Sequence, residues 1–367
     1  MGGASSQITE NMNIINIIDR IDKVNFGIWN AALLPCKTLY NIYKVKCFAV
    51  FPRINDMPDV KSLYNVEPII TDNTDTEVFI KILEKFSSSD TIIITHGSWR
   101  FPTRWGYFAA QQGFKWVYTP HGMLEPWGMT QKRLKKLVYF HLMEKRMARR
   151  AAAVRAVSKP EMHNLNKDFK KVAHIPNGAD IFKCYSEVTK PVTLLFLGRL
   201  NSKKCVYEIL RAWIDSKAYR NKDYYLKIVG PDDGEFSRLD ALYRTLPENK
   251  NVYLSNTPVY GAEKEALLAG STFFLLPSQS EGFPTSVVEA GMAGCVPVIS
   301  DGCNFPELFE NQLGIKVESN YESLLKFFNN IPQPSNRKQY TDYFVENYSI
   351  EAIAEKMISL YKRLLEH

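Results

Sequence analysis

Short, nearly uninterrupted apolar runs recur along the whole chain, and helix-like segments separate them. The runs that we interpret as strands are Asn13–Ile18, Lys46–Phe51, Thr91–Thr95, Trp116–Thr119, Val154–Val157, Val172–Ile175, Val192–Leu197, Tyr225–Val229, Val252–Leu254, Phe273–Leu276 and Val296–Ile299. Strands that are apolar throughout and alternate with helices are typical of parallel sheets covered on both faces. So many strands in 367 residues predict an α/β protein with two doubly wound domains rather than one sheet.

The predicted domain boundary follows the turn Pro176-Asn177-Gly178, where mixed polar residues precede the strong strand that begins at Val192. We therefore expect an N-terminal Rossmann-like domain over residues 1–185 and a second over residues 186–348. Apolar residues at helical spacing predict a last helix within residues 349–367.

The net charge of +7 favours an anionic partner such as a nucleotide, a phospholipid surface or nucleic acid. We find neither an apolar run long enough to span a bilayer nor a signal-peptide pattern. The 6 cysteines show no C-x-x-C spacing, which favours a reduced setting and indicates no zinc site. These features lead us to expect a cytoplasmic protein, either soluble or attached peripherally to the inner face of a membrane.

Cations follow the strand Val192–Leu197, in the sequence Gly198-Arg199-Leu200 and then Lys203-Lys204. Ligands of open parallel sheets bind at the carboxyl ends of the strands. Arginine can fork onto phosphate oxygens and lysine adds a point charge, so this stretch suits a diphosphate. A solvated loop with surface cations is the alternative, and the spacing alone does not separate the two.

Two glutamates, Glu281 and Glu289, lie on either side of the turn Gly282-Phe283-Pro284, just past an apolar strand. Thr285 or Ser286 can cap a following helix, whose free N–H groups would favour an anionic ligand. The residues alone leave a structural alternative open. Ser286-x-x-Glu289 also matches a capping box, and Glu281 could be a solvated loop acid.

Two His-Gly pairs follow two neighbouring strands, as His96-Gly97-Ser98-Trp99-Arg100 and as His121-Gly122. A neutral imidazole can bind a sugar hydroxyl or move a proton near pH 7. A purely structural histidine is the alternative at each position. After the first strand, Asn25-Phe26-Gly27 is a weak phosphate-loop signal and also reads as a plain loop.

A basic segment spans residues 130–155, with Lys and Arg clustered at both ends and apolar residues between them. Such a helix can lie on an anionic membrane surface. The alternative is a core-packed helix with a solvated basic face. The charge is too dispersed to indicate nucleic acid, which we do not expect as a partner.

Together these motifs resemble the family-4 glycosyltransferases, which are retaining sugar transferases of GT-B fold. The resemblance runs in order along nearly the whole chain and rests on His96-Gly97-Ser98-Trp99, Pro120–Leu124, Ile175–Asp180, Gly198-Arg199-Leu200…Lys204 and Glu281…Glu289-Ala290. The chain departs from the family pattern at Cys205, where a glycine is usual. It also departs at Asn25-Phe26-Gly27, where paired glycines are usual.

The resemblance implies two Rossmann-like domains that face each other across a cleft, with the last helix packed back on the N-terminal domain. It implies a UDP- or GDP-linked sugar as donor and a lipid-linked sugar or a polysaccharide as acceptor. His121, Glu281, Lys204 and Arg199 would be catalytic, and Glu289 would hold the ribose. The remaining expected donor contacts are Gly27, Gly198, Gly282, Phe283, Pro284 and Thr285, and the expected acceptor contacts are His96, Trp99 and Arg100.

No D-x-D motif follows an apolar strand, so we expect no metal ion and no cofactor besides the nucleotide sugar. Two other functions fit the same architecture. One is a nucleotide-sugar epimerase, which needs no acceptor, and the other is a protein that binds nucleotide sugars without turnover.

Overall fold

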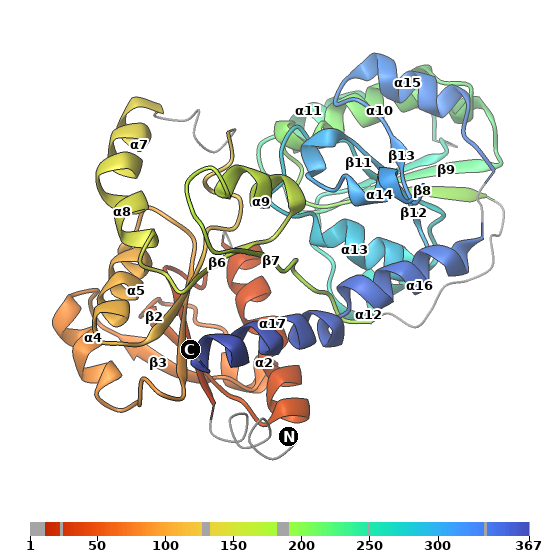
Figure 1. Ribbon diagram of the computed structural model, residues 1–367. Helices are drawn as coiled ribbons and strands as arrows, with labels where there is room; N and C mark the ends of the chain where they lie inside the picture. The colour runs from red at the N-terminus through yellow and green to blue at the C-terminus, as the bar shows by residue number, and fades with distance from the viewer. Residues whose placement is uncertain are drawn as a thin grey trace. The chain divides into compact units, whose positions relative to one another are not determined.

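The computed structural model describes residues 12–22, 25–126, 133–181, 191–248, 250–333 and 336–366. Contacts divide the chain into two compact units, which are described separately (Figure 1). The first unit runs up to Gly178 and resumes at Ile350, and the second comprises Ala179–Ser349. The boundary expected between residues 185 and 186 falls within residues 182–190, outside the described residues.

The first unit contains a seven-stranded sheet whose neighbouring strands are all parallel. In sheet order the strands are β3 (Glu67–Thr71), β2 (Lys46–Pro52), β1 (Asn13–Ile18), β4 (Thr91–His96), β5 (Lys115–Thr119), β6 (Ala153–Ala156) and β7 (Val172–His174). The order reverses between β1 and β4. This reversal is the switch point at which doubly wound sheets bind ligands.

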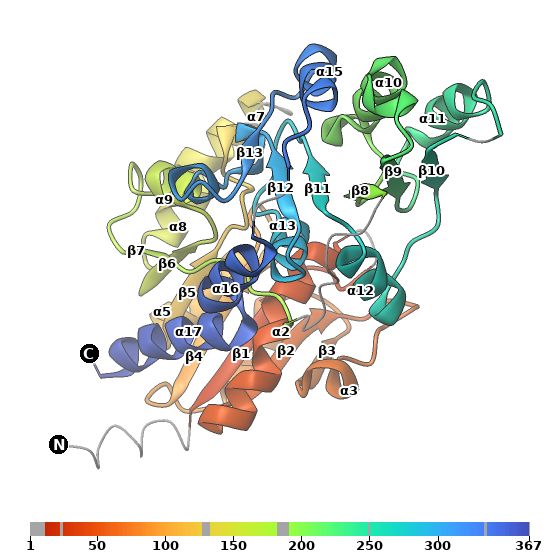
Figure 2. The ribbon, with the colours of Figure 1, turned by 90° about the vertical axis from the view of Figure 1, so that its right-hand side faces the viewer.

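Two apolar clusters pack helices against this sheet (Figures 1 and 2). The helices are α2 (Phe26–Tyr43), α3 (Val60–Tyr64), α4 (Thr76–Leu83), α5 (Phe101–Gln111), α9 (Lys159–Leu165) and α17 (Ile350–Leu365). In one cluster α2 and α17 pack side by side, with Leu33 and Met357 buried between them and the strands. In the other, Phe79 of α4 stacks on Trp105 of α5 with ring centroids 4.6 Å apart.

The second unit contains a six-stranded sheet that is also parallel throughout. In sheet order the strands are β10 (Val252–Ser255), β9 (Tyr224–Val229), β8 (Val192–Leu197), β11 (Phe273–Leu276), β12 (Val296–Ile299) and β13 (Ile315–Lys316). The strand order again reverses once, between β8 and β11. The second unit therefore repeats the doubly wound plan of the first.

Helices and short helical turns connect the strands of the second unit, and α10 and α15 pack against each other (Figure 2). The helices are α10 (Val206–Asp215), α11 (Phe236–Tyr243), α12 (Gly261–Ala269), α13 (Thr285–Met292), α14 (Glu307–Glu310), α15 (Tyr321–Asn329) and α16 (Arg337–Tyr348). The short turns are η2 (Ser202–Lys204), η3 (Ala218–Arg220) and η4 (Asp301–Cys303). A single apolar core that includes Trp213 and Phe273 joins these helices to the sheet.

The prediction of two doubly wound parallel sheets is confirmed, and each predicted run forms a strand whose ends shift by at most one residue. The sequence analysis missed β3 and β13, which are both edge strands. β3 contains Pro68, and its first two residues are exposed. β13 has only 2 residues. Edge strands tolerate proline and bury less apolar surface, so their apolar pattern is weak.

The prediction of one basic helix over residues 130–155 is wrong. The described part consists of α7 (Arg133–Tyr139), a π-helical turn η1 (Phe140–Glu144) and α8 (Lys145–Ala148), and residues 130–132 lie outside the described residues. Arg155 belongs to β6, where its buried guanidinium donates to the carbonyl oxygens of Ile175 and Pro176 at 2.9 and 2.8 Å. Residues 153–156 are buried in the sheet as β6, so the helix does not continue through them.

Candidate active site

In the second unit, the chain segments that follow β8 and β11 lie at the switch point of the sheet. The 3₁₀ turn η2 follows β8, and the Asn201 side chain caps it by accepting the backbone N–H of Lys204 at 3.2 Å. Gly230, at the end of β9, has a φ of +151°, and a Cβ there would lie 1.9 Å from the carbonyl oxygen of Gly198. Glycine is therefore required where these two strand ends approach each other.

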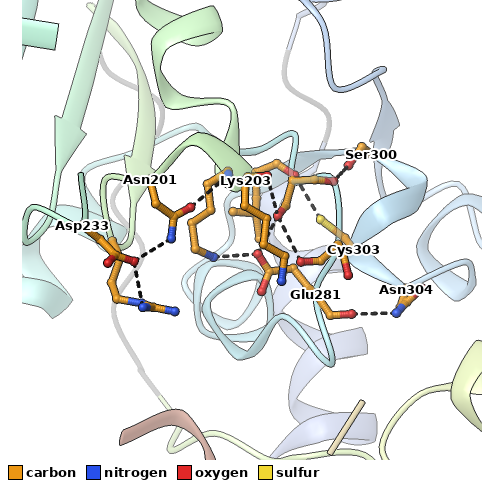
Figure 3. Close-up of polar contacts among 12 residues, drawn as sticks. Asn201, Lys203, Asp233, Glu281, Ser300, Cys303 and Asn304 are labelled. Carbon is orange, nitrogen blue, oxygen red and sulfur yellow. Dashed lines mark hydrogen bonds and ion pairs between the residues drawn. The ribbon is translucent and has the colours of Figure 1, made fainter. Parts of the chain in front are cut away.

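Lys204 and Glu281 form a largely buried ion pair between the two segments (Figure 3). The Lys204 Nζ lies 2.7 Å from Glu281 Oε1, and the side chains are 14% and 17% exposed. The Ser278 hydroxyl donates to the same carboxylate oxygen at 2.7 Å. Burial raises the pKa of Glu281, but Lys204 and Ser278 outweigh it, so the net pKa lies below its usual value. Glu281 is thus an ionised carboxylate held against a fixed cation.

The backbone of Glu281 is held as firmly as its side chain (Figure 3). Its N–H donates to the Gly302 carbonyl at 2.7 Å, and its carbonyl accepts from the Asn304 side-chain amide at 2.6 Å. A Cβ on Gly302 would lie 2.3 Å from the Ser278 carbonyl oxygen. The turn after β12 therefore packs directly under this loop and fixes the Glu281 carboxylate in place.

Arg199 lies at the same strand end but does not join the Lys204–Glu281 pair. Its NH1 atom lies 2.8 Å from Asp233 Oδ2, which also accepts from the Asn201 side-chain amide at 2.8 Å (Figure 3). The Arg199 side chain is 56% exposed, so this ion pair is worth little in stability. Arg199 can reorient toward an incoming phosphate at small energetic cost.

Glu289 is paired with a lysine that the sequence analysis did not identify. The Lys264 Nζ on α12 lies 2.6 Å from Glu289 Oε1 on α13. Burial raises the pKa of Glu289, while Lys264 acts in the opposite direction. The capping-box alternative is not realised, because Pro284 is the N-cap of α13 and no side chain caps that helix start. The expectation that Thr285 or Ser286 caps the helix is therefore also wrong.

The turn Gly282-Phe283-Pro284 leads directly into the first turn of α13, which begins at Thr285. The Phe283 ring packs on Phe305 and Tyr348, with centroids 5.3 and 6.0 Å apart. Backbone N–H groups at such a helix start point toward an anion if one is present. Ser278 is a further site residue that the sequence could have revealed, since it lies two residues after the end of β11.

In the first unit, the two predicted histidines lie side by side at the ends of β4 and β5. His96 Nδ1 lies 2.9 Å from His121 Nε2, and His96 Nε2 lies 3.0 Å from Asn16 Oδ1. The Asn16 amide nitrogen faces the carbonyl oxygen of Phe48 at 3.4 Å, so its oxygen must accept from His96. His96 Nδ1 then accepts from His121 Nε2. This arrangement leaves His121 Nδ1 as a hydrogen-bond acceptor.

Both histidines are neutral near pH 7. Burial, with His121 and Arg155 nearby, lowers the pKa of His96 well below its usual value. Burial and Arg155 lower the pKa of His121 to about 3. Asn16 lies in the middle of strand β1 with isoleucines on both sides, and that contrast was the sequence signal that could have revealed it.

The loops that carry these histidines have unusual backbone geometry. Trp99 has a φ of 74° and His121 has a φ of 54°, and neither residue is a glycine. Buried Glu161 holds the second loop by accepting the N–H of Gly122 at 2.6 Å and that of Val157 at 2.7 Å. Left-handed non-glycine residues concentrate at functional sites, where the surrounding structure maintains the strain.

A cavity of about 760 Å³ opens beside His96 at the switch point between β1 and β4. Its lining includes His96, Trp99, Arg100, Met123, Lys136 and Tyr139. All three predicted acceptor residues therefore line one cavity. Gly27 lies in the first turn of α2 and has no positive φ.

We predict that the neutral histidines make the fold sensitive to acid. The folded pKa of His121 is below the ordinary 6.5, so the unfolded chain binds an extra proton and stability is lost as the pH falls from 6.5 toward about 3. By about pH 5 this residue should account for about 2 kcal/mol of lost unfolding free energy. Denaturant titrations at several pH values give the unfolding free energy as a function of pH. This free energy should fall less steeply on acidification in His121→Asn than in the wild type. His163 is exposed, so His163→Asn should keep the wild-type dependence of unfolding free energy on pH. The same pH dependence in both variants would contradict the role given to His121.

Within the described residues, no group of three or more His, Cys, Asp or Glu side chains is arranged to hold a metal ion. Across the same residues, no helix has both the length and the apolar character needed to cross a membrane.

Comparison with known proteins first defines the class to which this fold belongs. HepE from Anabaena, solved in complex with UDP and glucose, superposes with a TM-score of 0.70 at 16% identity, covering 96% of this chain and 100% of that one. A putative UDP-N-acetylglucosamine 2-epimerase from Listeria monocytogenes superposes with a TM-score of 0.65 at 13% identity, covering 97% of each chain. The two units thus form the GT-B architecture.

Two family models match adjacent parts of the chain. The model described as glycosyl transferases group 1 matches residues 179–333, and the model described as glycosyltransferase family 4 matches residues 73–182. The chain therefore belongs to the family-4 glycosyltransferases of GT-B fold.

Two curated relatives match shorter segments. GDP-mannose:cellobiosyl-diphosphopolyprenol alpha-mannosyltransferase of Xanthomonas oryzae pv. oryzae is 32% identical over 130 residues, 35% of this chain and 34% of that protein. An uncharacterized glycosyltransferase of Haemophilus influenzae is 30% identical over 174 residues, 45% of this chain and 47% of that protein. The chain thus spans less than half the length of the curated relatives that it matches.

Proposed function

We propose that this protein is a retaining glycosyltransferase that moves a sugar from a UDP- or GDP-linked donor to a lipid-linked or polysaccharide acceptor without a metal ion. The observation that carries this proposal is the buried Lys204–Glu281 pair at the switch point of the second unit, with Arg199 at the same strand end and the start of α13 nearby. Fixed positive charge at that place suits a nucleoside diphosphate leaving group.

In the proposed mechanism, Lys204 and Arg199 stabilise the negative charge that develops on the departing diphosphate. Gly198, the turn Gly282-Phe283-Pro284 and the N–H groups at the start of α13 complete the anion site. The Glu289 carboxylate accepts hydrogen bonds from the ribose hydroxyls. These assignments extend the family resemblance residue by residue, and Lys264 adds a cation that opposes the rise in the pKa of Glu289 caused by burial.

Glu281 contacts the donor sugar in this proposal. Ionised Glu281 can stabilise positive charge at the anomeric carbon while the acceptor attacks from the same face, or it can form a covalent intermediate that the acceptor then displaces; either course retains the configuration. Neutral His121 offers its Nδ1 lone pair to a sugar hydroxyl, because its other nitrogen donates to His96. The acceptor occupies the cavity lined by His96, Trp99 and Arg100.

The donor base is the first property to measure, because one relative is named for GDP-mannose and one fold neighbour holds UDP. A thermal-shift panel of UDP, GDP, dTDP and ADP, with and without EDTA, should show one selective base that is insensitive to EDTA. A ligand at about a hundred times its dissociation constant adds about 2.7 kcal/mol of stability. No shift with any of the four would contradict the proposed donor site, and a shift abolished by EDTA would contradict its metal independence.

An epimerase is the second candidate, since a putative epimerase shares the fold. It would convert the nucleotide sugar without an acceptor, whereas a transferase needs an acceptor for rapid release of the nucleotide. A protein that only binds the donor would show the thermal shift and neither reaction. Product analysis of donor alone, and of donor with acceptor, separates the three.

We further propose that the protein works in the cytoplasm at the surface of an anionic membrane, through the basic segment of residues 130–155. The support comes from the exposed Lys135 and the exposed apolar residues of α7. Sedimentation with phosphatidylglycerol vesicles tests this: a protein that stays in the supernatant contradicts the proposed attachment.

A further inference from the structure

The cavity of the first unit is strongly cationic. Among the described residues that line it, Arg20, Arg100, Lys135 and Lys136 are cations and Asp19 is the only carboxylate. The formal charge of the lining is therefore four minus one, or +3, because both nearby histidines are neutral. An uncharged sugar would not require such a lining, whereas an anion would be attracted by it.

Two acids offset part of this charge, because Arg20 pairs with Asp22 at 2.8 Å and Arg100 pairs with Asp19, which leaves Lys135 and Lys136 as the other cations of the lining. Asp19 pairs with Arg100 at 3.3 Å, and the Arg100 side chain remains 63% exposed. The Lys136 ammonium lies 5.8 Å from the Trp99 ring centroid, on the wall of the cavity. Arg100 and Lys136 come from different elements and reach the same cavity. Two convergent cations are suited to a phosphate group.

Helix α7 and the following turn η1 carry an apolar stripe beside these lysines. Leu134, Val138 and Leu142 are 78%, 50% and 61% exposed, and their spacing of four places them on one side of the segment. Lys135, Lys136 and Tyr139 line the cavity. At about 3.6 residues per turn, they lie on the adjoining side of the helix. Leu134 and Val138 are therefore next to cavity-lining residues along the helix.

The π-helical turn η1 anchors this arrangement. It turns Glu144 into the core, where its carboxylate accepts from the hydroxyls of Thr103 at 2.8 Å and Tyr118 at 2.7 Å. Those buried hydrogen bonds hold the segment while Leu134, Val138 and Leu142 stay exposed. Single-turn π-helices are frequent at functional sites, and this one follows the residues that line the cavity.

We propose that this cavity binds a phosphate-bearing lipid acceptor, with the phosphate against Lys136 and Arg100 and the aliphatic chain along the Leu134–Val138–Leu142 stripe. The sugar of that acceptor then lies toward His96. The phosphate serves as a recognition group, and no bond to it is made or broken. This inference rests on the proposed glycosyltransferase function and narrows its acceptor to a sugar carried on a lipid phosphate or diphosphate.

Direct binding measurements can test the two halves of this recognition separately. The probes are farnesyl diphosphate, farnesol and inorganic pyrophosphate, each titrated calorimetrically below the concentration at which micelles form. Farnesyl diphosphate should bind at least about tenfold more tightly than pyrophosphate, because only it reaches the stripe. It should also bind at least about tenfold more tightly than farnesol, because only it carries the charge.

Variants locate the binding. Lys136→Gln and Arg100→Gln should each weaken the binding of farnesyl diphosphate by about tenfold. The double variant Leu134→Ser/Val138→Ser should weaken the binding of farnesyl diphosphate but not that of pyrophosphate. Leu63→Ser is a matched control, since Leu63 is 56% exposed on α3, away from the cavity lining. Lys204→Ala is a second control. It should leave farnesyl diphosphate binding unchanged, because Lys204 is not among the residues that line the cavity.

Equal affinity for farnesol and farnesyl diphosphate would overturn the phosphate contact, and equal affinity for pyrophosphate and farnesyl diphosphate would overturn the lipid contact. Probe binding that is lost in Lys204→Ala but kept in Lys136→Gln would assign the probe to the nucleotide site and reject the proposal. A failure of the proposed function looks different: no nucleotide shifts the melting temperature, whatever the cavity binds.

Discussion

Replacing Lys204 with alanine should lower the rate of sugar transfer by about a hundredfold to a thousandfold, while the protein remains folded. The lysine is the most firmly positioned cation at the proposed diphosphate site, because its ammonium lies 2.7 Å from the buried Glu281 carboxylate. A preorganised charge of this kind stabilises the leaving group without reorganising during the reaction. Steady-state kinetics with the donor found by thermal shift give the measurement.

The same substitution also removes the partner of a buried carboxylate, so its structural cost must be separated from its catalytic cost. Losing one member of a buried pair costs about 3 kcal/mol or more of unfolding free energy. Because the pKa of Glu281 is lowered in the folded protein, the pair contributes its stability above the carboxyl's unfolded pKa, and this contribution is lost on acidification. At neutral pH, therefore, Lys204→Ala should lower the melting temperature.

The double variant Lys204→Met/Glu281→Gln provides the matched control, because it removes both charges and keeps similar side-chain volumes. It should recover much of the lost stability and none of the lost activity. Lys222→Ala, an exposed lysine of the same unit, should change neither quantity. Wild-type turnover by a folded Lys204→Ala protein would rule out the role assigned to this lysine.

Replacing Glu289 with alanine should weaken nucleotide binding by about tenfold to a hundredfold, since hydrogen bonds to a charged group are worth about 1.5–3 kcal/mol. Glu289 is largely buried, and Lys264 is held at 2.6 Å from it. The variant loses both the acceptor for the ribose hydroxyls and the partner of that lysine. Calorimetric titration with the selected nucleoside diphosphate measures the loss.

Glu289→Gln distinguishes the two functions of this side chain. The amide keeps an acceptor for a hydroxyl but loses the charge that faces Lys264, so its nucleotide affinity should lie between those of wild type and Glu289→Ala. Glu265→Ala removes an exposed acid from the same helix as Lys264 and should leave affinity unchanged. If Glu289→Ala binds nucleotide as wild type does, the carboxylate serves only as the partner of Lys264.

The two lysine–glutamate pairs give the proposed donor site a common design. Each carboxylate is buried, which raises its pKa, and each is kept near a cation from another element. At Glu281, whose net pKa is lowered, the pairing prepares an ionised acceptor before any ligand arrives, so binding requires little reorganisation. The substitution of Cys205 for the usual glycine fits the same loop, since Cys205 adopts a left-handed φ of 53° next to Lys204.

Local sequence was sufficient for the strands and for the residues that follow them. The apolar runs predicted each central strand because a strand buried on both faces must be apolar throughout. Placing ligand residues after those strands predicted that Lys204 and Glu281 lie together, and the structure joins them at 2.7 Å. This contact follows because parallel strands end at one edge of the sheet and β8 lies next to β11.

Tertiary structure decided the partners that come from distant elements. Asn16 and His96 are 80 residues apart and meet only because β1 and β4 are neighbours in the sheet, and that contact sets which nitrogen of His121 accepts. Lys264 reaches Glu289 across two packed helices, and no local pattern marks it. The sequence by itself therefore determined which segments form the central strands and which reactive side chains follow each strand. Protonation, ion pairing and the exposed stripe of α7 depend on desolvation and neighbours, and these exist only once the chain has folded.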